Sequence, residues 1–117
     1  MREDSRIRKH ADFRKLFKEG KRFSSPHFVL YIRKAGLGSS RFAAGIAKAH
    51  IKLATRRNRL RRVAREEFRN TLAPMVTKYD ILLVSKKNPN EKLARMTITA
   101  QEIRKLINNA KEGLVNG

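Results

Sequence analysis

The sequence contains no cysteine and no tryptophan, and only 10 of its 117 residues are acidic. Without cysteine there is no disulfide framework, no thiolate zinc site and no cysteine nucleophile. No apolar run approaches the roughly 20 residues that a membrane span requires, and no apolar core follows the basic N-terminal segment as it would in a secretory signal. We therefore expect a soluble, cytoplasmic protein with a single domain over residues 1–117.

Positive charge is the dominant property of the composition. The 29 lysines and arginines outnumber the acidic residues and give a formal net charge of +19. A small domain needs a net charge of only about 2 to 8 for solubility. A larger net charge destabilises the fold, because the like charges repel one another. A bound polyanion would offset that repulsion. Nucleic acid is therefore the expected partner, and an anionic membrane surface is the less favoured one.

The pattern of apolar residues predicts an α+β domain in which helices cover a small sheet. The expected elements are a flexible basic arm over 1–9, a helix over 10–19, strands over 27–34 and 41–48 that form an antiparallel hairpin, a helix over 52–72, a strand over 79–85, and a last helix that starts with the capping box 99–102. Gly20 is expected to end the first helix in a left-handed conformation. In the strand over 27–34, Tyr31 is expected on the face opposite Phe28 and Ile32.

The helix over 52–72 carries an arginine-rich face. At 100° per residue, Leu60, Val63 and Ala64 cluster on the side that anchors the helix to the core. The opposite side carries Asn58, Arg61, Arg62, Arg65 and Arg69. Guanidinium groups bind phosphate through a planar fork and stack on bases, so this nearly single-sign face favours nucleic-acid binding. A merely solvated face is the first alternative. Membrane binding is the second, but the helix lacks the large apolar wedge of an interfacial helix.

The arginine-rich helix and its surroundings resemble a known family. The run 57–59 (Arg-Asn-Arg), followed by 60–62 (Leu-Arg-Arg) and 65–66 (Arg-Glu), is similar to the "RNR" helix of the bacterial ribonuclease P protein subunit. Segments 12–20, 28–31, 44–48 and 79–80 resemble that family's first helix, central strand, and the strands before and after the RNR helix. Where the family often has Ser-Lys-Lys and a glycine before this helix, we expect Lys48 and Lys52 to supply the positive charge.

The resemblance implies a fold and a function. The fold is a central sheet of about four strands with three helices and a left-handed βαβ crossover, as in the ribosomal protein S5 domain 2-like fold. The partner is a large catalytic RNA that, with Mg²⁺, removes the 5′ leader from precursor tRNA. The protein is then a subunit of a ribonucleoprotein endoribonuclease. It binds the leader and supports substrate and metal-ion affinity, and it supplies no catalytic residue and no metal site. We expect no DNA or membrane partner.

The resemblance also implies which residues bind RNA. Single-stranded RNA binds where bases stack on aromatic rings and the backbone follows basic groups. The residues expected in a leader-binding cleft between the first helix and the sheet are Phe13, Phe17, Tyr31, Arg14 and Lys18. Those expected to contact the catalytic RNA or the substrate are Lys52, Arg56, Arg57, Asn58, Arg59, Arg61, Arg62, Arg65 and Arg69. For Phe13 and Phe17, burial in the core is the alternative role.

Three other functions compete with this interpretation. Another RNA-binding protein, such as a ribosomal protein, fits the composition equally well. A self-sufficient ribonuclease could use His10, His27 and His50 as acid and base, but each lies in a different element and none in a recognisable catalytic motif. A DNA-binding role fits the arginine-rich helix, but no helix-turn-helix spacing precedes it.

Overall fold

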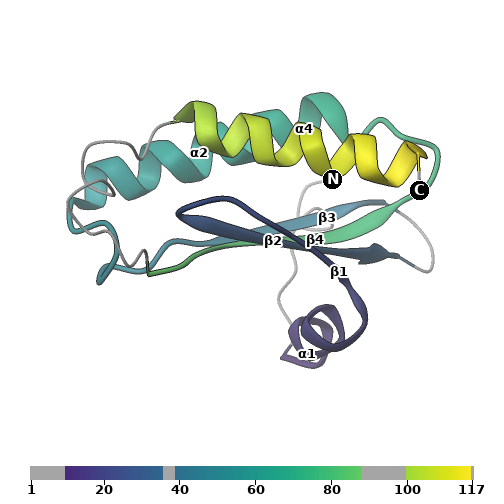
Figure 1. The fold of residues 1–117 in the computed structure, drawn as a ribbon, viewed down its shortest axis with the longest axis horizontal. Helices are drawn as coiled ribbons and strands as arrows, with labels where there is room; N and C mark the ends of the chain where they lie inside the picture. The colour runs from purple at the N-terminus through teal and green to yellow at the C-terminus, as the bar shows by residue number, and fades with distance from the viewer. Residues whose placement is uncertain (1–9, 36–38, 88–99, 117) are drawn as a thin grey trace.

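The structure, a computed structural model, describes residues 10–35, 39–87 and 100–116. In chain order the elements are α1 (His10–Glu19), β1 (Lys21–Ser24), β2 (Phe28–Lys34), β3 (Arg41–Gly45), α2 (Ala54–Thr71), β4 (Tyr79–Ser85) and α4 (Ala100–Asn116). The four strands form one sheet in the order β1-β2-β4-β3. Helices α2 and α4 cover one face of the sheet and α1 lies on the other (Figure 1). The α+β architecture is as the sequence predicts, while the expected arm over 1–9 lies outside the described residues.

The prediction that the strands over 27–34 and 41–48 form a hairpin is wrong. The hairpin joins β1 to β2, with Lys21 opposite Ile32. Strand β3 ends at Gly45 and pairs in parallel with β4 rather than with β2. Local patterns missed β1 because its four residues include a single apolar side chain, Phe23, and therefore show no alternation. They misplaced β3 because a parallel partner lies on the far side of a crossover helix.

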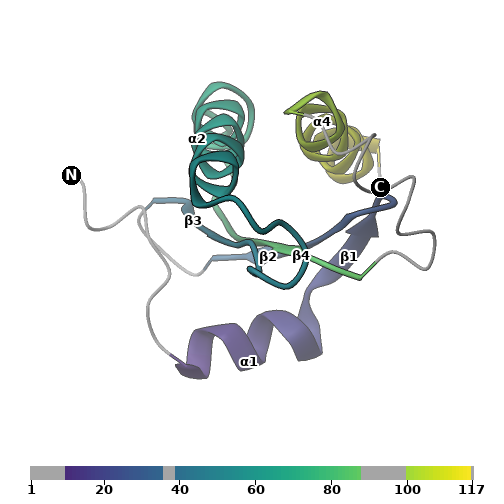
Figure 2. The ribbon, with the colours of Figure 1, turned by 90° about the vertical axis from the view of Figure 1, so that its left-hand side faces the viewer.

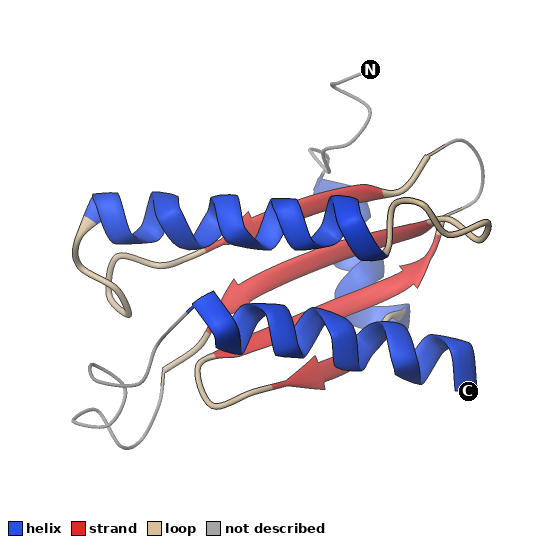
Figure 3. Ribbon diagram, turned by 90° about the horizontal axis from the view of Figure 1, so that it is seen from above, coloured by secondary structure: helices blue, strands red, loops and turns tan. Residues whose placement is uncertain are grey.

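The connection from β3 through α2 to β4 is left-handed, as the resemblance implies. Seen from the helix side in Figure 3, the chain leaves β3, returns over the sheet in α2 and enters β4 beside it. Nearly all connections between parallel strands of one sheet are right-handed. The handedness could therefore be expected only from the family pattern and not from general rules.

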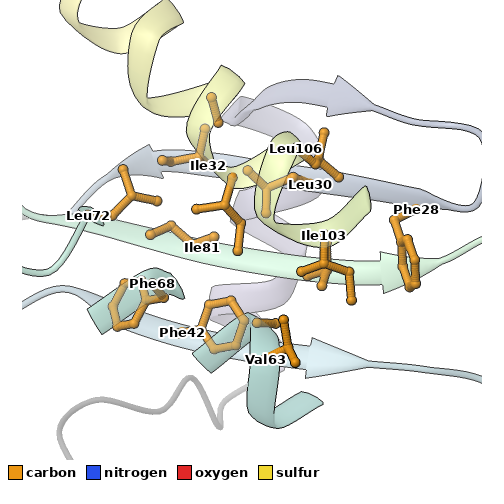
Figure 4. Packing of buried hydrophobic residues seen from close by; sticks show 14 of the residues in the cluster. Phe28, Leu30, Ile32, Phe42, Val63, Phe68, Leu72, Ile81, Ile103 and Leu106 are labelled. Atoms are coloured by element: carbon orange, nitrogen blue, oxygen red, sulfur yellow. The ribbon is translucent and has the colours of Figure 1, made fainter. Parts of the chain in front are cut away.

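The main core fills the space between the sheet and the two long helices. Phe28, Leu30 and Ile32 of β2 are at most 1% exposed and point into it, as their alternation predicts. The rings of Phe42 from β3 and Phe68 from α2 stack with their centroids 5.1 Å apart (Figure 4). This packing fixes α2 on the sheet, and with it the orientation of the arginine-rich face.

A smaller apolar cluster lies under the opposite face of the sheet. Leu16 of α1 is fully buried against Leu82 of β4. Gly20 follows α1, and a Cβ there would lie 2.6 Å from the carbonyl oxygen of Leu16. Its backbone is not in the left-handed region, which corrects the expectation. Glycine is required at this position because α1 and β2 come too close for any side chain.

Polar contacts at the start of α4 tie it to the turn between β1 and β2. The carboxylate of Glu102 accepts hydrogen bonds from the Ser25 hydroxyl at 2.6 Å and from the backbone N–H of His27 at 2.8 Å. Its other oxygen lies 2.7 Å from Nδ1 of His27, which is buried. The expected capping box begins at Thr99, outside the described residues. Glu102 therefore links two segments 75 residues apart.

Candidate nucleic-acid interface

The face of the sheet that packs against α1 carries three rows of side chains that run across the strands. Strand pairing places residues of β2, β4 and β3 side by side in each row. From β2 to β3 the rows are Arg33, Asp80 and Arg41; Tyr31, Leu82 and Ala43; and Val29, Val84 and Gly45. A charged row and two apolar rows thus share one surface, and α1 runs across the strands below it (Figure 2).

A pair of aromatic rings, one exposed and one half-buried, lies where α1 meets this surface. Phe17 of α1 contacts Tyr31 of β2 edge to face, with ring centroids 4.9 Å apart. Phe17 is 54% exposed, an unusual state for a large apolar side chain held against its neighbour. Phe13 is half-buried beside Leu16. The pair therefore presents ring surface to solvent, while Phe13 belongs partly to the small core.

Two cations on α1 complete the set that the sequence predicts around these rings. Arg14 and Lys18 are exposed and lie four residues apart, on one side of the helix. We call Phe13, Phe17, Tyr31, Arg14 and Lys18 the aromatic site. The structure brings its three aromatic residues together and leaves its two cations open to solvent.

The charged row connects the sheet to α1, and no local sequence pattern predicts this connection. Asp80 is 1% exposed and accepts two hydrogen bonds of 2.8 Å from Nε and Nη2 of Arg41. The Nε atom of Arg33 lies 3.9 Å from the same carboxylate, and its Nη1 donates to Glu19 of α1 at 3.0 Å. A buried carboxylate needs such partners to offset its lost hydration. An aspartate within an apolar strand was the signal that could have revealed this network.

Helix α2 buries the side that the sequence predicts and exposes most of its arginines. Leu60, Val63, Ala64 and Phe68 are buried. The exposed polar residues are Asn58, Arg59, Arg62 and Arg69, and the half-buried arginines are Arg56, Arg57, Arg61 and Arg65. Lys52, just before the helix, is exposed. The predicted basic residues of α2 therefore share one surface, on which some side chains are exposed and others are half-buried.

Arg57 is held by the loop before α2. Its Nη1 donates to the carbonyl oxygens of Ile51 at 2.9 Å and Lys52 at 2.8 Å. The helix begins after Leu53, whose side chain makes no capping hydrogen bond. Arg57 therefore stabilises the path of the chain into α2, a structural role that the motif alone did not indicate.

Arg65 lies on the side of α2 that faces β3, and Arg61 lies one turn before it. Arg61 donates to Oδ1 of Asn58 at 2.8 Å. The guanidinium carbon of Arg65 lies 5.5 Å from the centroid of the Phe42 ring, within the range of a cation–π contact. Arg65 is therefore half-buried at the edge of the arginine-rich face, although its helical position opposite Leu60 and Val63 predicts full exposure.

The histidines have structural partners. Besides contacting Glu102, His27 is only 4% exposed, which keeps it from a substrate phosphate. Nδ1 of His50 lies 2.7 Å from Oγ of Ser85, and that oxygen also accepts the N–H of Ala47 at 2.8 Å. The side chain of His10 lies outside the described residues. The two described histidines thus hold turns and loops together and do not form an acid–base pair.

Sequence comparison identifies the family. The family model for ribonuclease P matches residues 1–111. The chain belongs to the ribonuclease P protein family. The ribonuclease P protein component of Thermotoga maritima is 37% identical over 107 residues, which cover 91% of this chain and 89% of that protein. The ribonuclease P protein component of Aliivibrio salmonicida is 35% identical over 80 residues, or 68% of each chain.

Solved structures of ribonuclease P proteins share the fold. The Thermotoga maritima protein in complex with 1-(4-fluorophenyl)-2-thiourea superposes with a TM-score of 0.69 at 33% identity, covering 90% of this chain and 95% of that one. A Staphylococcus aureus ribonuclease P protein mutant superposes with a TM-score of 0.70 at 22% identity, covering 92% and 85%, and supports the fold alone. These matches support the fold described above.

As a ribonuclease P protein, the chain is a subunit of a ribonucleoprotein endoribonuclease that processes precursor tRNA, and its partner is RNA. The described residues contain no group of three or more histidine, aspartate or glutamate side chains that could hold a metal ion. In the same part of the chain, no helix has both the length and the apolar character needed to span a bilayer.

Proposed function

We propose that the chain binds the single-stranded 5′ leader of precursor tRNA at the aromatic site and the catalytic RNA through α2. The observation that carries the first assignment is the half-exposed ring of Phe17, held edge to face against Tyr31. A ring fixed in this way loses little freedom when a base stacks on it, and such stacking contributes about 1–3 kcal/mol per base. Arg14 and Lys18 are available for the phosphates on either side.

The second assignment rests on the exposed surface of α2. Arg59, Arg62 and Arg69 are exposed and make no ion pair within the described residues. Arginines without an internal counter-charge are suited to the phosphates of a folded RNA. Arg57 contributes indirectly, because it holds the loop that carries Lys52. Since its substrates are transcripts, the protein would act in the cytoplasm.

The described residues do not fit a magnesium site on the protein. Asp80 is committed to Arg41, and Glu102 is committed to Ser25 and His27. We infer that the Mg²⁺ required by the holoenzyme is held by the catalytic RNA. The protein would support metal affinity indirectly, by fixing the substrate and reducing repulsion between the RNA strands.

The test is the affinity of the reconstituted holoenzyme for precursor tRNAs whose leaders are trimmed one nucleotide at a time. Phe17→Ala and Tyr31→Ala should each weaken binding of leader-bearing substrate by about tenfold, because one stacking contact is lost. Binding of mature tRNA should stay unchanged. Tyr31→Phe is the matched control, since it keeps the ring and should bind as the wild type does. A loss by the same factor at every leader length, including none, would contradict the proposal.

A further inference from the structure

Gly45 lies at the open end of the row formed with Val29 and Val84. Exposure rises along this row, from 4% for Val29 through a half-buried Val84 to an exposed Gly45. Strand β3 is an edge of the sheet. Solvent therefore reaches the backbone of Gly45 on the same face that carries Tyr31.

The fold itself gives no reason for a glycine at this position. Its backbone is outside the left-handed region, and an added Cβ would meet only Cγ1 of Val84, at an ordinary contact distance of 3.8 Å. Gly20 and Gly113 differ, because a Cβ would lie 2.6 Å from a backbone oxygen at Gly20 and 3.0 Å from the Phe23 ring at Gly113. A glycine weakens a strand through its backbone entropy and its missing side chain. Gly45 thus lowers stability without easing any internal contact.

A glycine in a strand often marks a bulge, a tight bend or a place where a ligand approaches the backbone. Gly45 pairs in regular register with Val84, which leaves the approach of a ligand as the interpretation we pursue. The surroundings of Gly45 suggest the type of ligand. Ala43, two residues earlier on the same face, packs in the cluster that includes Tyr31. Lys48, three residues later, is exposed. A ligand with a flat group next to the aromatic site and a phosphate near Lys48 would suit these surroundings. One nucleotide of single-stranded RNA has both groups.

We propose that Gly45 determines how closely the leader can approach β3, by leaving room for one nucleotide against the strand backbone beside the aromatic site. The inference rests on the proposed function, since it extends leader binding from Phe17 and Tyr31 toward the edge of the sheet. A branched side chain at residue 45 would occupy the space of that nucleotide. The rest of the site would be unchanged.

The experiment compares Gly45→Ala and Gly45→Val in the reconstituted holoenzyme, with substrates of decreasing leader length. Affinity for leader-bearing precursor tRNA should fall about threefold for Gly45→Ala and tenfold or more for Gly45→Val, as one nucleotide contact is progressively lost. Affinity for mature tRNA should not change. Ser24→Val is the matched control: Ser24 is exposed at the β1 end of the same row, and both variants introduce the same strand-favouring side chain.

Thermal unfolding of each variant checks the fold, and Gly45→Val should melt no lower than the wild type because valine is favoured in strands. A second measurement does not depend on a bulky side chain. Because the chain has no cysteine, Gly45→Cys can carry a single photo-crosslinker. In the holoenzyme it should crosslink one or two adjacent leader nucleotides, and Ser24→Cys should crosslink none of them.

The outcomes separate this inference from the proposed function. If the wild type loses affinity as the leader is trimmed and Tyr31→Ala reduces that loss, leader binding stands. The role of Gly45 is then overturned if Gly45→Val matches the wild type, or if residue 45 crosslinks only to the catalytic RNA. If the wild type shows no dependence on leader length, the proposed function itself fails.

Discussion

The two faces of the sheet differ in what holds them together. The face under α2 and α4 is covered by large, fully buried side chains such as Phe42 and Phe68. The face packed against α1 has a small apolar cluster, an aromatic pair with one exposed ring, and a buried carboxylate between arginines. The main core thus lies on one face, and the residues proposed to bind the leader lie on the other. One face can therefore keep rings and cations in solvent without loss of the fold.

The largest effect that tests this comparison concerns two phenylalanines. Phe42→Ala should lower the free energy of unfolding by about 3–5 kcal/mol, because it leaves a cavity against Phe68. Phe17→Ala should lower it by about 1 kcal/mol, the value of an edge-to-face contact on a half-exposed ring. Urea unfolding followed by circular dichroism measures both. Equal losses would show that α1 is as important to stability as the main core.

The charged row gives the next largest effect. Asp80→Asn should lower the free energy of unfolding by about 3 kcal/mol, because Arg41 and the largely buried Arg33 lose their shared counter-charge. Glu19→Gln removes an exposed partner of Arg33 and should cost no more than about 1 kcal/mol. Unfolding of both variants in urea provides the comparison. Similar values for the two would mean that burial of Asp80 adds nothing to the network.

The smallest expected effect is the difference in stability between variants of two arginines of α2, Arg62 and Arg65. Arg62→Ala should weaken binding of the catalytic RNA about tenfold through loss of a phosphate contact, and leave stability within about 0.5 kcal/mol of the wild type. Arg65→Ala should also lower the free energy of unfolding, by about 1 kcal/mol, because its guanidinium lies over the Phe42 ring. Filter binding and urea unfolding on the same preparations test this. If Arg65→Ala left stability unchanged, the ring contact would contribute nothing.

The sequence predicted features that repeat locally and missed those that depend on distant partners. The alternation in β2 and the apolar stripe of α2 correctly predicted which face of each element is buried. Burial of one face imposes a regular spacing of apolar residues in both elements. The predicted partner of β3 was wrong because β3 pairs with β4, and α2 separates these two strands in the sequence. The Asp80 network and the loop contacts of Arg57 involve residues that no periodic pattern connects. The handedness of the crossover came from family resemblance alone.

The order of strands in the sheet also affects how the chain can fold as it is synthesised. Strand β4 lies between β2 and β3, although it comes after both of them in the described part of the chain. Within the described sheet β3 has no other partner, and β2 otherwise pairs only with the four-residue β1. The N-terminal half therefore emerges from the ribosome with its strands incompletely paired. The main core includes residues of β4 and α4, so we expect it to close only after both have been synthesised.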